Sequence, residues 1–288
     1  MLLLAILLVT AGPPLDAIAA PAGGTVGFAA QDLASGRSLG LRQDQPFPMQ
    51  SVFKLPIAIE VLRQVDDGKL NFDRVIALGP ADARVGSAGT IAIPSQPTIR
   101  ELLEAMVVSS DNIACDRLLA LVGGPRAVDA RIRGLGIEGM TIRFSEREIQ
   151  AGKGDNTTTP AAMVALLAKI ARQGTGLSPE SNKRLMDLLL QVSTGEKRIK
   201  GALPAGTPVA HKTGSSRTEG GKTDATNDVG LISLPNGHRV AIAVFVHASP
   251  ADERTREETI AQLARAAYDA FTRRPYGRPR KAATPAPQ

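Results

Sequence analysis

The sequence predicts an α/β (α+β) fold: one antiparallel sheet, built from both chain termini and flanked by helices, together with an all-helical lobe. Runs with strand character lie near both ends of the chain, at residues 25–32, 38–41, 208–213, 228–234 and 239–247. Between residues 51 and 191 the pattern is helical instead. Strands from the two ends can share one sheet, which leaves the helical middle to pack beside it. We therefore expect the active site in the cleft between the two lobes.

Residues 25–32 (TVGFAAQD) have the apolar composition of a mostly buried strand. Ala34-Ser35-Gly36-Arg37 is typical of a turn, and it leads into a short partner strand at 38–41. Near the other end, Pro235-Asn236-Gly237 joins two further strands and is a hairpin signal. Ser249-Pro250-Ala251-Asp252 resembles a capping box before a final helix that ends near Phe271.

Start and stop signals mark the helices of the middle region. Residues 51–65 begin with a serine and continue with apolar positions at helical spacing. Helices are also predicted at 98–108 and 112–122, the second ending at Gly123-Gly124-Pro125. Two more begin where an N-cap residue is followed by proline, at Thr159-Pro160 and Ser178-Pro179.

These elements divide the chain into parts. Residues 21–48 and 192–271 are predicted to form the α/β lobe, and residues 49–191 the helical lobe. Residues 272–288 hold five basic residues and no acidic one, and this Pro-rich, basic composition predicts a disordered tail. Most of the net charge of +6 therefore lies in the tail, and the rest of the chain is nearly neutral.

Residues 1–20 allow two interpretations, a signal peptide or a truncated first helix. The apolar run Leu2–Val9 is too short to span a bilayer, and Ala17-Ile18-Ala19 offers a cleavage site. However, no lysine or arginine precedes the run. We expect export, with a periplasmic or secreted protein that has no membrane anchor.

Composition argues against several classes of function. The chain has no tryptophan, two tyrosines and seven phenylalanines, fewer aromatic rings than base stacking in a nucleic-acid binder requires. The three histidines and the single Cys115 form no ligand cluster, so no metal site is expected. One cysteine also excludes an internal disulfide.

Three motifs carry the chemistry. Ser51-Val52-Phe53-Lys54 places a hydroxyl and an amine one helical turn apart, at a helix start where unpaired N–H groups favour a developing oxyanion. A lysine with a lowered pKa can take the proton of such a serine.

Ser110-Asp111-Asn112 lies between two predicted helices, where it is either an ordinary N-cap or a turn that directs Ser110 and Asn112 into the cleft. Lys212-Thr213-Gly214 ends a strand, where Lys212 and Thr213 can face a carboxylate and the glycine lets a substrate backbone approach. The occurrence of all three motifs in this order is far more specific than any one of them.

In this order, the three motifs resemble the signature of the class A serine β-lactamases and their penicillin-binding relatives. The resemblance covers about residues 25–271, and the run from Val229 to Val246 is most similar to the PER-type extended-spectrum branch. It implies a soluble, monomeric hydrolase with a small-molecule β-lactam substrate, no nucleic-acid partner and no cofactor. Such an enzyme confers resistance to β-lactam antibiotics through a serine acyl-enzyme.

The resemblance also implies roles. Ser51 is the nucleophile, Lys54 and Glu146 serve proton transfer, and Ser110 and Lys212 act on the leaving nitrogen. Glu146 lies at the family's 36-residue spacing from Ser110, which favours it over Glu148. The implied substrate-binding residues are Asn112, Gln150, Arg198, Thr213, Gly214 and Ser215.

Several positions depart from the common family pattern. Gln150 replaces the asparagine that usually holds the hydrolytic water, and the loop's Arg–Asp closing pair is replaced by Phe144 and Asn156. Thr226 occupies the position of a frequent carboxylate-binding arginine, for which Arg198 is an alternative. Two other functions use similar motifs: a D-alanyl-D-alanine peptidase, and a β-lactam sensor domain that stays acylated.

Overall fold

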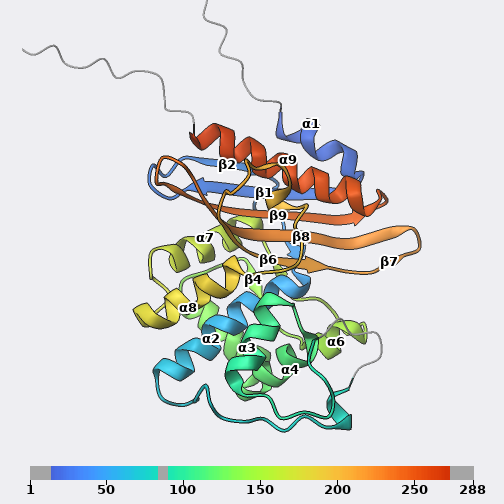
Figure 1. Cartoon of the computed structure of the whole chain (residues 1–288). Coiled ribbons are helices and arrows are strands. Elements are labelled where there is room, and N and C mark those ends of the chain that lie inside the picture. Colours follow the sequence, from blue (N-terminus) through green and yellow to red (C-terminus); the bar gives the residue numbers. More distant parts are fainter. Residues whose placement is uncertain (1–13, 84–89, 273–288) are drawn as a thin grey trace, which may run out of the picture.

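The computed structural model describes residues 14–83 and 90–272, in which a sheet covered by helices lies over a mainly helical part (Figure 1). The larger sheet has the order β2-β1-β9-β8-β6, with β7 paired to β8, and every pairing is antiparallel. Its strands are β1 (Thr25–Asp32), β2 (Ser38–Leu41), β6 (Val209–Ser215), β7 (Thr218–Glu219), β8 (Lys222–Ser233) and β9 (Arg239–Ser249). The predicted sheet from both chain termini is thus confirmed.

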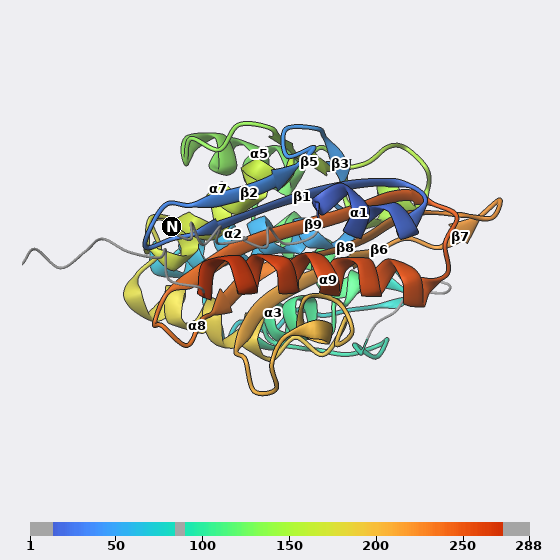
Figure 2. The same cartoon turned by 90° about the horizontal axis from the view of Figure 1, so that it is seen from above.

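Helices cover both faces of this sheet. On one face lie α9 (Glu253–Thr272) and the short α1 (Leu15–Ala19), with the turn η1 (Ala20–Ala22) beside them, as Figure 2 shows from above. On the other face lies α7 (Pro160–Ala171), in contact with β9 and β1. Side chains of β9 alternate between two cores, because successive residues of a strand point to opposite faces. Ile242 and Val244 belong to the core under α9, whereas Ala243 and Phe245 belong to the core shared with the helices.

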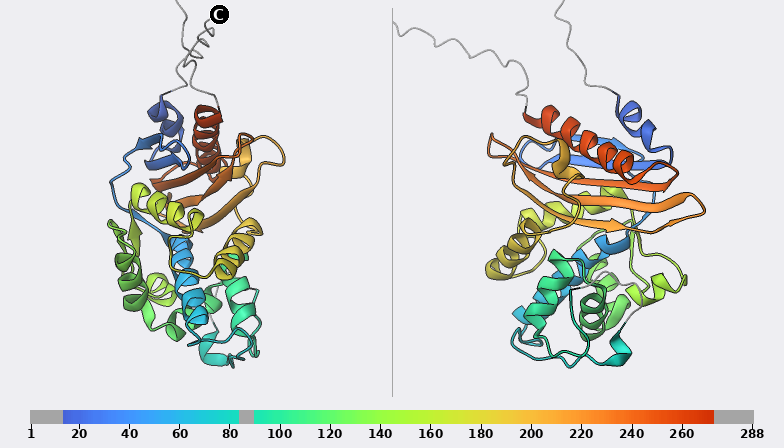
Figure 3. Two further views of the ribbon diagram at one scale, coloured as in Figure 1. Left: turned by 90° about the vertical axis from the view of Figure 1, so that its left-hand side faces the viewer. Right: turned by 45° about the vertical axis from the view of Figure 1, so that its right-hand side comes forward.

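The remaining helices pack below the sheet (Figure 3). They are α2 (Lys54–Asp66), α3 (Ile99–Val108), α4 (Asn112–Leu121), α5 (Gly124–Gly134), α6 (Glu146–Gln150) and α8 (Pro179–Leu190), with turns η2 (Gln50–Phe53) and η3 (Pro80–Asp82). The turn η4 (Ile199–Ala202) instead lies against α9, and Ile199 belongs to the core under that helix. Residues 54–62 of α2 are all buried, so this helix lies at the centre of the helical core. The middle region is not wholly helical. A small sheet of order β3-β5-β4 joins β3 (Phe47–Pro48), β4 (Met140–Thr141) and β5 (Thr157–Thr158).

Several predicted boundaries coincide with the observed ones. Thr98, Thr159 and Ser178 cap their helices, each accepting a backbone N–H with its side chain. The capping box predicted at residues 249–252 is wrong. Ser249 ends β9 and bonds Ala22, while Asp252 accepts the Thr255 N–H at 2.7 Å. Asp252 is the acceptor because it directly precedes the first helical residue, Glu253.

The N-terminal residues that the structure describes pack into the fold. The predicted cleavage site, Ala17-Ile18-Ala19, lies within α1, which contacts α9, and Ala19 and Ala22 are buried in the core under α9. These contacts favour a first helix over a leader for residues 15–19. The apolar run Leu2–Val9 and nearly all of the predicted tail lie outside the described residues. Within residues 14–83 and 90–272, no helix is long and apolar enough to cross a bilayer.

Candidate active site

Lys54 lies at the centre of the site. Its Nζ donates to Ser51 Oγ at 2.8 Å, Ser110 O at 2.7 Å, Ser110 Oγ at 3.2 Å and Asn112 Oδ1 at 2.6 Å. The side chain is fully buried, as expected at the start of the central helix α2. Two of the three predicted motifs therefore meet at one amine.

Ser51 lies on the short turn η2, which leads directly into α2. We predicted an α-helix from Ser51, but the α-helix begins at Lys54 and the serine is in a 3₁₀ turn. Gln50, the residue before it, has φ +45°, a left-handed conformation that is strained for a non-glycine residue. The three-residue spacing still brings the two side chains together, because residues i and i+3 share a face of either helix type.

Ser110, Asp111 and Asn112, at the connection between α3 and α4, each make different contacts. Asp111 is the N-cap of α4, accepting the Ala114 N–H at 2.8 Å, and it also accepts the N–H groups of Thr90 and Ile91. Ser110 has φ +60°, so its carbonyl and hydroxyl both contact Lys54. The N-cap interpretation and the cleft interpretation of this motif therefore hold together, for different residues.

Lys212 approaches the same hydroxyl from the sheet. It lies on the edge strand β6, is 1% exposed, and donates from Nζ to Ser110 Oγ at 2.9 Å. Burial and the Lys54 charge hold the pKa of Lys212 well below its ordinary value of 10.5, partly offset by Asp228, Cys115 and Glu146. Ser110 Oγ thus lies between two lysine amines, an arrangement that can pass a proton.

Glu146 and Glu148 lie on the same short helix but have different surroundings. Glu146 is 6% exposed and its Oε2 lies 4.0 Å from Lys54 Nζ. Glu148 instead caps α6 through the N–H and hydroxyl of Ser145, and it pairs with Lys153. The Ser145 hydrogen bonds and the Lys153 ammonium lower the pKa of Glu148. The structure therefore brings Glu146 to the lysine. Gln150 Nε2 lies 3.4 Å from Glu146 Oε1.

Two further residues hold the Glu146 segment. Asp116, one helical turn after Asn112 on α4, accepts the N–H groups of Glu146 and Arg147 at 2.8 and 3.2 Å. Sequence reasoning missed Asp116, although its four-residue spacing from Asn112 was a usable signal. Asn156 closes the loop by bonding the backbone N–H and C=O of Phe144, so one amide takes the place of the usual ion pair.

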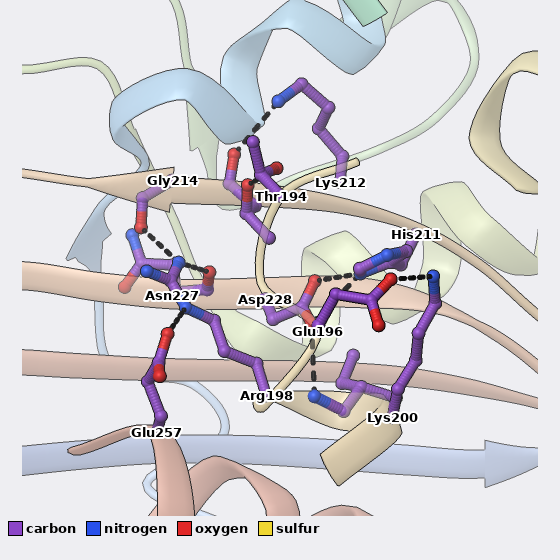
Figure 4. Close-up of polar contacts among 12 residues, drawn as sticks. Thr194, Glu196, Arg198, Lys200, His211, Lys212, Gly214, Asn227, Asp228 and Glu257 are labelled. Atoms are coloured by element: carbon purple, nitrogen blue, oxygen red, sulfur yellow. Dashed lines mark hydrogen bonds and ion pairs between the residues drawn. The ribbon is translucent and has the colours of Figure 1, made fainter. Parts of the chain in front are cut away.

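The predicted carboxylate-binding residues are Thr213 and Ser215 of the edge strand β6 and Arg198, which directly precedes η4 and is labelled in Figure 4. Thr213 Oγ1 lies 2.6 Å from the hydroxyl of Thr194, which sequence reasoning also missed. The buried Arg198 guanidinium donates to Ser215 Oγ at 2.8 Å, and its Nε pairs with Glu257 of α9 at 3.1 Å. The hydroxyl of Thr226 accepts a hydrogen bond from Arg256 Nε at 2.8 Å.

Gly214 lies where β6 approaches the backbone around Ser51. A Cβ at this position would lie 2.5 Å from Met49 O and 3.2 Å from Ser51 N. The glycine therefore lets β6 approach the backbone around Ser51, and its expected role in the approach of a substrate backbone stays a prediction. Asn227 of β8 supports the same segment by donating to Pro48 O and Met49 O.

Comparisons with known proteins agree with this geometry. The family model described as "Beta-lactamase enzyme family" matches residues 14–271. The chain is 41% identical over 232 residues to the extended-spectrum β-lactamase PER-1 of Pseudomonas aeruginosa, a match that covers 78% of this chain and 75% of PER-1. It is 36% identical over 242 residues to VEB-1 of the same organism, with 81% of each chain covered.

The fold agrees as well. A β-lactamase structure from Chitinophaga pinensis superposes with a TM-score of 0.85 at 42% identity, covering 89% of this chain and 97% of that one. The TLA-3 extended-spectrum β-lactamase superposes with a TM-score of 0.84 at 32% identity, covering 90% of this chain and all of that one. The predicted resemblance to the PER-type branch is confirmed, and the chain belongs to the β-lactamase enzyme family, in its class A.

Proposed function

We propose that this class A β-lactamase, a hydrolase, opens the lactam amide of penicillins and cephalosporins with Ser51 as nucleophile. The observation that carries the proposal is the convergence of four side chains on Lys54 Nζ. Ser51, Ser110 and Asn112 lie within hydrogen-bond distance of this amine, and Glu146 lies 4.0 Å from it. Nucleophile, proton acceptor and proton donor are therefore contiguous.

Acylation begins when Ser51 Oγ attacks the lactam carbonyl and loses its proton. Lys54, or Glu146 acting through a water molecule, or both accept that proton. The backbone N–H groups of Ser51 and Ser215 stabilise the negative charge that develops on the carbonyl oxygen. As the C–N bond breaks, Ser110 Oγ passes its proton to the lactam nitrogen and receives through Lys54 the proton that Ser51 released, while Lys212 stabilises the charge on Ser110.

Deacylation separates a β-lactamase from a peptidase or a sensor. Glu146 removes a proton from a water molecule, whose oxygen attacks the acyl ester and releases Ser51. Among the described residues, Glu146 Oε2 is buried without a hydrogen-bond partner, so this oxygen is available to accept from water. Gln150 holds the other carboxylate oxygen, which supports its role in placing that water.

The edge strand β6 supplies substrate recognition in this proposal. Thr213 and Ser215 present hydroxyl groups, and the Arg198 charge lies 2.8 Å behind Ser215 Oγ, a combination suited to the substrate carboxylate. Gly214 lies between these two residues in the chain and allows β6 to lie against the Ser51 backbone. Asn112 contacts the amide of the substrate side chain.

We also infer that the protein acts as an exported monomer. The apolar run Leu2–Val9 supports a leader that ends before α1, since α1 is packed against α9. N-terminal sequencing of the protein recovered from the periplasm or medium would test export. A cytoplasmic location, or a mature chain beginning within α1, would contradict it.

The proposed function is tested by following the intact-protein mass and the hydrolysis of a chromogenic substrate in the same reaction. The protein is incubated with a chromogenic cephalosporin while its intact mass and the absorbance are followed. We expect many turnovers with only a transient adduct. A lasting stoichiometric adduct with a colour burst that stops would instead indicate a peptidase or a sensor, and the absence of both adduct and colour would refute the assembled site.

A further inference from the structure

Two buried ionisable side chains behind the carboxylate-binding edge have no part in this mechanism. His211 of β6 and Asp228 of β8 are both fully buried, and His211 Nδ1 lies 2.9 and 3.1 Å from the two carboxylate oxygens (Figure 4). With the carboxylate as acceptor, Nδ1 carries the proton and donates it. His211 directly precedes Lys212 in the chain.

Asp228 also contacts the segment that carries Arg198. Its Oδ2 accepts the N–H of Ile199, the first residue of η4, at 3.1 Å. The preceding residue of β8, Asn227, accepts Arg198 Nη1 through its backbone oxygen at 2.9 Å. Two successive residues of β8 therefore bond Arg198 and Ile199: Asn227 through its main-chain oxygen and Asp228 through its carboxylate.

The strand register places this pair beside Thr213, on the same face of the sheet. Thr213 is paired with Asp228 and His211 with Gly230, so all four positions share one face of the sheet. A Cβ on Gly230 would lie 2.8 Å from the Cβ of His211 and 2.5 Å from Ala210 O. The glycine therefore makes room for the strand that carries the histidine.

Stability alone is a poor explanation for such a pair. Removing two polar, ionisable groups from water is costly, and well-packed apolar residues often replace them without loss of stability. The Asp228 carboxylate, held by His211, instead accepts the backbone N–H of Ile199, directly after the arginine whose guanidinium reaches Ser215. Such contacts are typical of residues that orient a binding group, here the Arg198 guanidinium.

We propose that His211 and Asp228 form a positioning pair, which holds Arg198 in the orientation that directs its guanidinium toward the substrate carboxylate beside Thr213 and Ser215. This inference rests on the proposed function, in which these residues bind that carboxylate. The pair acts through Arg198 and does not touch the substrate.

The test compares two replacements of His211. His211→Leu removes the donor while filling the space, and His211→Asn keeps an N–H donor near the position of Nδ1. For a cephalosporin with its C4 carboxylate, we expect kcat/KM of His211→Leu to fall about tenfold with kcat nearly unchanged. His211→Asn should recover most of that loss. When a substrate contact is equally strong in the ground state and the transition state, its loss raises KM and leaves kcat unchanged.

Affinity measured without turnover separates this inference from the function itself. In the Ser51→Ala background, His211→Leu should weaken the calorimetric Kd of the same cephalosporin by a similar factor. It should cause no further loss when Arg198→Ala is also present, because both changes then affect one contact. If the parent protein does not hydrolyse the compound, the proposed function fails, and the Kd series still decides the role of the pair.

A second histidine–aspartate pair provides a matched control. His238 Nδ1 lies 3.1 Å from the buried Asp32, at the β8–β9 turn. His238→Leu should lower the urea midpoint but leave Kd and kcat/KM unchanged. Should His211→Leu fail to fold, Asp228→Leu removes the acceptor of the same pair. Equal losses for His211→Leu and His211→Asn, or additive losses with Arg198→Ala, would overturn the proposal.

Discussion

Replacing Glu146 by glutamine is expected to stall the enzyme after acylation. Glutamine keeps the size of the side chain and an oxygen that can hold a water, but it cannot accept a proton. Glu146 is 6% exposed, and Oε2 has no hydrogen-bond partner among the residues that the structure describes. Lys54 lies 4.0 Å from that oxygen and is occupied by Ser51, Ser110 and Asn112. We therefore expect no other side chain to substitute as base.

The size of the effect follows from the loss of one general base. Such a group contributes about 10²–10⁴-fold to a rate, which corresponds to about 3–5 kcal/mol of activation free energy. Because acylation can still use Lys54, the loss falls on deacylation, and the acyl-enzyme becomes the main species during turnover.

The assay is intact-protein mass spectrometry in the steady state, combined with kcat for a chromogenic cephalosporin. Glu148→Gln is the matched control on the same helix, and it should turn over at nearly the parental rate because Glu148 is bonded to Ser145 and Lys153. Turnover of Glu146→Gln at the parental rate, or accumulation of adduct in Glu148→Gln instead, would refute the reasoning.

Four further outcomes are expected. Ser51→Ala should abolish both turnover and adduct, and substantial residual hydrolysis would remove Ser51 from the nucleophile role. Arg198→Ala should raise KM for carboxylate-bearing substrates about tenfold to 150-fold, the effect of losing a charged hydrogen bond worth about 1.5–3 kcal/mol; an unchanged KM would assign the arginine to structure. Asp116→Leu should lower kcat and prolong the adduct by releasing the N–H of Glu146, and unchanged deacylation would contradict that positioning. Lys212→Met should abolish efficient turnover yet raise the urea midpoint at pH 7, because a buried group whose pKa is lowered opposes folding while the unfolded chain binds its proton. The parent should therefore gain stability relative to this variant as the pH rises from the lowered pKa of Lys212 toward 10.5. If the urea midpoints of the two proteins change in parallel with pH, Lys212 does not cause the difference.

Signals that act over a few residues predicted much of the fold. Caps such as Thr98, Thr159 and Ser178 bond N–H groups within three residues, so the chain segment itself contains both partners. The strands β1 and β2 begin and end where composition and the turn predicted them. The capping box at residues 249–252 failed because two nearby residues could cap the helix, and the end of β9 decided between them.

Sequence by itself determined the order of the elements, the three motifs and hence the family, because these depend on residue identity and spacing along the chain. Spacing already favoured Glu146 over Glu148, and the tertiary structure added the reason, because Glu146 lies 4.0 Å from Lys54 whereas Glu148 bonds Ser145. It also assigned Gly214 to the approach of β6 toward Ser51 and brought together His211, Asp228 and the Arg198 segment. The physical reason is that charge, burial and hydrogen bonding at these positions depend on residues distant in the chain, which meet only when the sheet and helices pack.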